Sequence, residues 1–208
     1  MHDVGIYENL ILGIHFLLLK KCKIFDEKTI VRCYTGRSMR INVRKHERRG
    51  YQSIKMSNIL EKQFLKQRND FEKSCVERDK KYHFPQGVIF ETDIAYAKDK
   101  NKAHRLDRYR PKGKEAQILP VIINVHGGGL LLGNKEFNKY FCALLSKKGF
   151  LVYSMEYRLI PDCTFFDQLR DIFLAMDFVK EHAAADGGDL SHVYLCLLYT
   201  SPSPRDTR

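Results

Sequence analysis

The stretch Leu119-Pro120-Val121-Ile122-Ile123-Asn124-Val125-His126-Gly127-Gly128-Gly129 decides the fold of this 208-residue chain. Its first seven residues form an almost continuous apolar run, which is typical of a strand that is buried on both faces. A glycine run follows this strand directly. Glycine adopts backbone dihedrals that other residues avoid, and it lets another group approach the main chain closely. The stretch therefore predicts a central strand that ends in a loop of unusual backbone geometry.

Helix and strand patterns alternate after this loop. Residues 134–148 are predicted to form a helix that Gly149 ends, and 150–156 are predicted to form a strand. A helix is predicted over 164–182, and a further strand starts at 193–195. Because strand–helix–strand alternation is typical of a parallel sheet covered on both faces, the fold class is predicted to be α/β.

Two further patterns precede the central strand. Alternating residues after Pro85-Gln86-Gly87 are predicted to share one strand face; they are Val88, Phe90, Thr92, Ile94 and Tyr96. A second short strand is predicted at about 106–110. Earlier, Asn58 with Glu61 resembles a capping box, and apolar residues then recur at helical spacing to about Lys80. This helix is either a surface helix packed by one face or a lid near a substrate pocket.

The loop from His126 to Gly129 has two interpretations when only its residues are considered. Acyl transfer places negative charge on the former carbonyl oxygen, and fixed backbone N–H groups in the loop could bind that charge. One such donor contributes about 3–4 kcal/mol in a working site. In the other interpretation, the glycines serve only the geometry of a tight turn.

Four ordered motifs resemble the hormone-sensitive-lipase-like and acetyl-esterase (HGGG) branch of the α/β-hydrolases. They are Leu106-Asp107-Arg108-Tyr109-Arg110-Pro111, the 119–129 stretch with Gly133, Glu156-Tyr157-Arg158-Leu159-Ile160-Pro161, and Asp171 with Gly187-Gly188-Asp189. The similarity covers about residues 85–195. It implies the N-terminal half of an α/β-hydrolase sheet, mostly parallel, with helices on both faces and an N-terminal helical segment.

The resemblance also implies a carboxylic-ester hydrolase that forms an acyl-enzyme with small, short-chain acyl esters and needs no cofactor or metal. The amides of Gly128 and Gly129 would be the oxyanion-hole donors, and Gly127 would set the turn. His126 would organise the loop, because the catalytic base of this family comes late in the chain. Tyr157, Arg158 and Asp171 are implied to be structural.

The chain departs from the family pattern after the last predicted strand. The family continues with Gly-x-Ser-x-Gly, whereas this chain reads Cys196-Leu197-Leu198-Tyr199-Thr200-Ser201-Pro202-Ser203-Pro204 and four further residues. Ser201 and Ser203 lack flanking glycines, and no Asp and His follow them. His182 and His192 precede the missing nucleophile, so they are interpreted as surface or capping residues. We therefore predict that the chain contains no catalytic nucleophile, acid or base and is inactive.

Four segments are predicted from these patterns. Residues 1–55 form a basic, poorly defined extension, with Met56 as a possible true start, and 56–84 hold the N-terminal helix, a possible lid. Residues 85–195 form a partial α/β-hydrolase domain. Residues 196–208 can be back-translated to a transposase-type adapter read in frame, so we interpret them as an artefactual, non-family tail of a C-terminally truncated fragment.

Composition leaves two other functions open. The net charge is +11, but residues 1–55 carry 12 Lys and Arg against 5 Asp and Glu. The basic excess is therefore mostly N-terminal, and a nucleic-acid-binding protein is the weaker alternative. A non-catalytic binding protein on a hydrolase scaffold is the other.

No nucleic-acid or membrane partner is predicted. The six scattered cysteines have no CxxC spacing, which favours reduced thiols in the cytoplasm.

Overall fold

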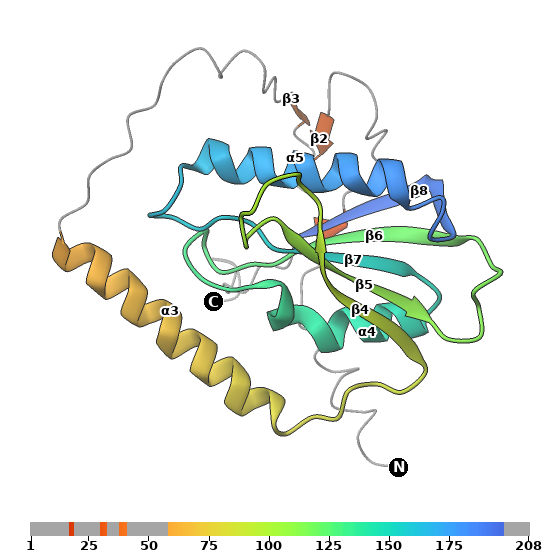
Figure 1. The fold of residues 1–208 in the computed structure, drawn as a ribbon, viewed down its shortest axis with the longest axis horizontal. Helices are drawn as coiled ribbons and strands as arrows, with labels where there is room; N and C mark the ends of the chain where they lie inside the picture. The colour runs from red at the N-terminus through yellow and green to blue at the C-terminus, as the bar shows by residue number, and fades with distance from the viewer. Residues whose placement is uncertain (1–16, 19–29, 33–37, 41–57, 198–208) are drawn as a thin grey trace, which may run out of the picture.

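The computed structural model describes residues 17–18, 30–32, 38–40 and 58–197 (Figure 1). The possible start at Met56 and residues 198–208 of the predicted tail lie outside the described residues, whereas Cys196 and Leu197 of that tail are described. Of the predicted basic extension, three short strands are described: β1 (Leu17–Leu18), β2 (Ile30–Arg32) and β3 (Ser38–Arg40). β2 and β3 pair with each other as an antiparallel two-stranded sheet.

The remaining strands form one six-stranded sheet together with β1, and helices pack against it. In chain order they are α3 (Asn58–Asp79), β4 (Val88–Ala95), β5 (Arg105–Pro111), β6 (Leu119–Val125), the 3-10 helix η1 (Lys135–Asn138), α4 (Lys139–Lys147), β7 (Leu151–Met155), α5 (Phe165–His182) and β8 (Gly188–Leu197). The strand order is β1-β8-β6-β7-β5-β4. β6 is parallel to β7 and β8, whereas β5 is antiparallel to β7 and to β4.

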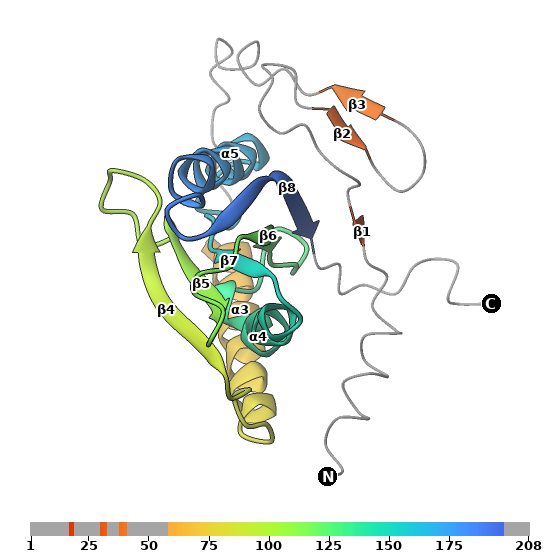
Figure 2. The ribbon, with the colours of Figure 1, turned by 90° about the vertical axis from the view of Figure 1, so that its right-hand side faces the viewer.

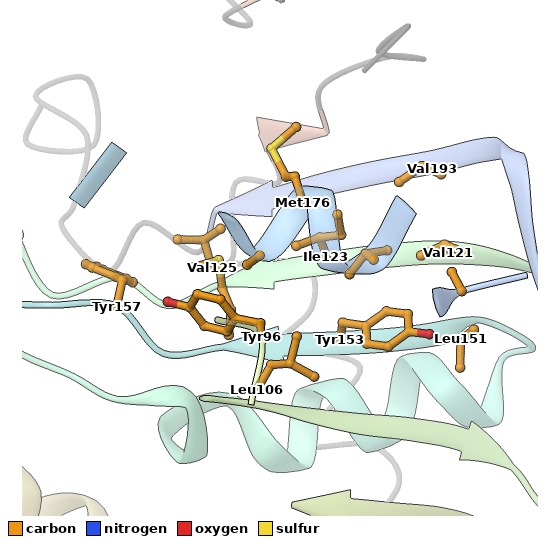
Figure 3. Packing of buried hydrophobic residues seen from close by; sticks show 14 of the residues in the cluster. Tyr96, Leu106, Val121, Ile123, Val125, Leu151, Tyr153, Tyr157, Met176 and Val193 are labelled. Atoms are coloured by element: carbon orange, nitrogen blue, oxygen red, sulfur yellow. The ribbon is translucent and has the colours of Figure 1, made fainter. Parts of the chain in front are cut away.

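Helices cover both faces of this sheet, as predicted. Figure 2 shows α5 and α4 on opposite sides of the strands. Beneath α5, the larger apolar cluster includes Ile123, Tyr153 and Met176 (Figure 3). Ile122, Val152 and Cys142 belong to the smaller cluster beneath α4. Each fully buried aliphatic side chain contributes roughly 1.5–3 kcal/mol, so burial on two faces makes β6 the centre of the fold.

The prediction that alternate residues from Val88 to Tyr96 share one strand face is wrong. A bulge in β4 interrupts its pairing with β5. The register shifts between Glu91 and Ile94, and Asp93 within the bulge has a φ of 60°. Phe90 stacks on Tyr109 in the cluster beneath α4, whereas Ile94 packs in the cluster beneath α5. An extra residue in one strand reverses the side-chain alternation beyond it, which a pattern of alternating residues cannot reveal.

Helix ends follow local capping chemistry. The Thr164 hydroxyl accepts a hydrogen bond from the Asp167 amide, and the Asp167 carboxylate accepts one from the Thr164 amide at 2.8 Å, so α5 begins with a capping box. The Asn134 side chain accepts from the Phe137 amide at 2.9 Å and caps η1.

In the part of the chain that the structure describes, no helix is long and apolar enough to cross a membrane.

Candidate active site: the glycine loop after β6

The loop that follows β6 lies at the carboxyl end of the sheet's central parallel strands. Val125, the last residue of β6, is paired with Met155 of β7 and with Leu197 of β8. β7 and β8 therefore end beside the start of the His126–Gly129 loop. Ligands of open α/β sheets bind outside the carboxyl ends of the strands, so this position is suited to a reaction site.

The glycines of this loop adopt conformations that a side chain would disturb. Gly128 has a φ of +128°, and a Cβ there would lie 2.0 Å from the Leu132 carbonyl oxygen. Gly129 has a φ of +63° with open space around it. The Gly128 carbonyl accepts hydrogen bonds from the amides of Leu131 and Leu132 at 3.2 and 3.0 Å. The loop is thus a closed turn, and the glycine run serves both its dihedrals and its close packing.

The amides of the two candidate oxyanion donors are unengaged. Among the described residues, neither the Gly128 nor the Gly129 N–H donates a hydrogen bond to another group. Gly129 is exposed and Gly128 is half-buried. Two adjacent N–H groups without an internal acceptor, in a turn of fixed shape, can bind an anionic oxygen.

His126 is completely buried beneath the loop. Its Nε2 atom lies 2.8 Å from Oε1 of Glu156, and its Nδ1 atom lies 2.9 Å from the Gly127 carbonyl oxygen. The ring stacks on Tyr157 with 4.2 Å between centroids, and the Tyr157 hydroxyl donates to the His126 carbonyl at 2.9 Å. Because both ring nitrogens are engaged, His126 is not positioned as a free general base. Its contacts instead hold the backbone of the loop in place.

Glu156 connects the loop to the end of β7, and its role was missed in the sequence. Besides His126, its carboxylate accepts from the amide of Lys135 at 3.0 Å and from that of Tyr157 at 3.3 Å. One side chain therefore fixes the histidine at the start of the loop and the backbone at its end. The available signal was a carboxylate directly after the fully buried strand β7.

A buried ion pair lies behind this end of the loop. The Nζ atom of Lys135 is 2.9 Å from Asp107 and 3.0 Å from Asp93, and the Asp107 side chain is fully buried. Burial raises the pKa of Asp107. Burial alone would lower the pKa of Lys135, but its hydrogen bonds to Asp107 and Asp93 outweigh that effect and raise it. The pair joins η1 to β5 and to the β4 bulge.

The residues implied to be structural form a second network. Asp171 is fully buried. Its carboxylate accepts hydrogen bonds from Arg158, from Nε at 2.9 Å and from Nη2 at 2.7 Å, and His104 Nε2 lies 3.0 Å from it. Gln168 donates through Nε2 to the carbonyls of Leu130 and Arg158, each at 2.9 Å. These contacts join α5 to Leu130, the residue that directly follows Gly129.

Other sequence candidates lie apart from the loop. His182 stacks on Phe178, and His192 pairs with Asp189 at 2.6 Å within the irregular first half of β8. The cysteines that the structure describes, Cys75, Cys142, Cys163 and Cys196, are free thiols. Burial raises the pKa of the Cys163 and Cys196 thiols to about 11, so they are protonated near neutral pH. Within the described ranges, no cluster of three His, Cys, Asp or Glu could hold a metal.

The sheet topology and the loop after β6 are those of the α/β-hydrolase fold, and the similar proteins are esterases. The BD-FAE family model matches residues 106–196. Isoprenylcysteine alpha-carbonyl methylesterase of Arabidopsis thaliana is 30% identical over 92 residues, which are 44% of this chain and 21% of that protein. Versiconal hemiacetal acetate esterase of Dothistroma septosporum is 29% identical over 87 residues, 41% of this chain and 26% of that protein.

Solved esterase structures share the fold. Esterase B from Lactobacillus rhamnosis superposes with a TM-score of 0.57 and 29% identity, over 64% of this chain and 44% of that one. A bacterial heroin esterase gives a TM-score of 0.53 and 27% identity, over 61% of this chain and 39% of that one. The chain therefore shares the α/β-hydrolase fold of these esterases and spans less than half the length of these relatives.

Proposed function

We propose that the loop from His126 to Gly129 is the oxyanion hole of a serine carboxylic-ester hydrolase. The single observation that carries this proposal is the pair of unengaged amides, at Gly128 and Gly129, in a rigid turn at the carboxyl end of β6. Gly127 provides the turn that follows the strand, and His126 organises the loop through Glu156 and Tyr157. The esterase names of similar proteins support this chemistry.

The loop would act while charge develops on the substrate. In the proposed reaction a serine hydroxyl attacks the ester carbonyl, whose oxygen then carries a negative charge. The Gly128 and Gly129 amides donate to this oxygen, the alcohol leaves, and water releases the acid from the acyl-serine. β8 runs parallel to β6 toward the loop, because Leu195 is the partner of Ile123. A serine presented directly after that strand would face these amides.

We propose a small acyl ester as the substrate. Two of the similar proteins are named for a methyl ester and for an acetate ester, and both names describe esters with a small group on one side of the bond. Gly129 and Leu130 are exposed at the outer side of the loop, where a carbonyl oxygen would approach. A cytoplasmic location stays a prediction from the cysteine pattern.

We further propose that this chain alone has no serine-dependent esterase activity. Its sequence contains no Gly-x-Ser-x-Gly, and loss of triad members leaves only residual catalysis. With p-nitrophenyl acetate, the purified chain is expected to match a heat-denatured sample of the same chain, with or without a fluorophosphonate. Turnover above that control that the fluorophosphonate abolishes would contradict the proposal.

A further inference from the structure

Helix α3 packs against the rest of the molecule with a single stripe. Its half-buried residues recur every three or four positions; they are Phe64, Arg68, Phe71, Cys75, Arg78 and Asp79. Near the end of the helix, Phe71 contacts the Phe137 ring at 5.1 Å, and Arg78 donates to the Phe137 carbonyl at 3.0 Å. The sequence pattern identified the apolar members of this stripe but omitted the arginine at its centre.

Arg68 reaches two separate loops with its guanidinium. Its Nε donates to the Leu131 carbonyl at 2.9 Å, Nη1 donates to Asp162 at 2.9 Å, and Nη2 donates to the Ile160 carbonyl. The side chain is only 14% exposed. A planar guanidinium with forked donors satisfies such a set of acceptors only in one orientation, so the contacts fix the two loops relative to each other.

The first of these loops continues directly from the oxyanion loop, since Leu131 lies two residues after Gly129. The Leu131 amide donates to the Gly128 carbonyl, and the Leu131 carbonyl accepts from Arg68. Leu131 therefore connects Arg68 to Gly128. The neighbouring Leu130 carbonyl accepts from the Ile160 amide at 3.1 Å. Any displacement of the Arg68 contacts would therefore be transmitted to the turn that presents the Gly128 amide.

We propose that Arg68 is a positioning residue of the oxyanion loop, and that α3 is a fixed support for this loop instead of a lid that opens. The inference rests on the proposed function, because it assigns the loop its role in binding the oxyanion. The contacts of α3 support it: Arg68 holds the helix at its middle, and Lys139 holds its end through a pair with Asp79 at 2.8 Å.

Hydrogen exchange of the full chain, followed by mass spectrometry, tests this role without any ester. In Arg68→Met, the amides of Leu131 and Leu132 are expected to exchange at least about tenfold faster, because the turn loses its outer partner. The amides of β6 are expected to keep their rates, which separates a local change from a global loss of stability. Arg68→Lys, which keeps the charge but loses the fork, is expected to show a smaller acceleration.

Arg78→Met is the matched control, since it removes another arginine that joins the same helix to a backbone carbonyl. It is expected to leave the exchange of residues 127–133 unchanged. An unchanged loop in Arg68→Met, or equal acceleration in both variants, would overturn the role of Arg68. If Arg68→Met does not fold, Arg68→Lys gives the same comparison. Because no ester is involved, these outcomes are independent of the esterase assay that tests the proposed function.

Discussion

Gly128→Ala is expected to lower the free energy of unfolding by about 3 kcal/mol or more, which is a large effect for one methyl group. The new Cβ would lie 2.0 Å from the carbonyl oxygen and 2.6 Å from the carbonyl carbon of Leu132, so the backbone of the turn must move. The φ of +128° is also unfavourable for an L-residue. Urea denaturation, with the slope checked for two-state behaviour, measures the change.

Gly129→Ala and Gly87→Ala are the matched controls for this prediction. Both positions have positive φ angles, +63° and +80°, but a Cβ would meet nothing within 4 Å at either one. Each change is therefore expected to cost only about 1–2 kcal/mol from the left-handed backbone conformation. Equal losses at Gly128 and Gly129 would show that the close contact to Leu132 does not define the loop.

Lys135→Met is expected to destabilise the chain by about 3–5 kcal/mol, because it leaves the Asp107 carboxylate buried without its cation. Asp107 already has one carboxylate oxygen without a hydrogen-bond partner among the described residues, so little compensation is available. Lys80→Met is the control: Lys80 pairs with Glu77 while both side chains are mostly exposed, and no measurable loss is expected.

The loss in Lys135→Met is also expected to depend on pH. Burial raises the pKa of Asp107, and the hydrogen bond from Lys135 lowers it, so removal of the lysine raises the pKa further. A carboxyl group with a raised pKa in the folded state stabilises the fold while it is protonated, and this stability is lost as the pH rises through that pKa. The difference from the unchanged chain should therefore be larger at pH 8 than at pH 5.

A second variant separates the ion pair from simple packing. Asp107→Leu combined with Lys135→Met removes both charges, and it is expected to recover most of the stability that Lys135→Met alone loses. Denaturation of the single and double variants at both pH values gives the comparison. A double variant as unstable as Lys135→Met at pH 8 would indicate that lost packing, and not the unpaired carboxylate, causes the effect.

The central part of the fold could be predicted from the sequence because its signals are local. Residues 119–125 are apolar on both strand faces, and a strand with that pattern needs helices on both sides. The capping residue Thr164 and the stop at Gly149 mark helix ends through their own backbone chemistry. The bulge at Asp93 could not be predicted, because its partners, Asp107 and Lys135, come from distant parts of the chain.

Some residues of the candidate site could also be predicted from the sequence, and others could not. Gly127, Gly128, Gly129 and His126 were predicted because their order after a buried strand resembles a known loop. Glu156, Lys135 and Arg68 were not assigned a role, because a polar side chain reveals its acceptor only when tertiary contacts bring the two together. A charged residue within an apolar helical stripe, such as Arg68, is a signal that could be used in similar sequences.

The central claim is that β8 precedes the nucleophile of an esterase whose oxyanion loop lies beside it. The most direct test is the natural reading frame of the gene beyond the codon of Leu195, determined by amplification from source DNA. We expect a Gly-x-Ser-x-Gly shortly after Leu195, in place of the residues of the tail, followed later by an aspartate or glutamate and a histidine. A natural stop codon directly after Arg208, or a continuation without that serine motif, would contradict it.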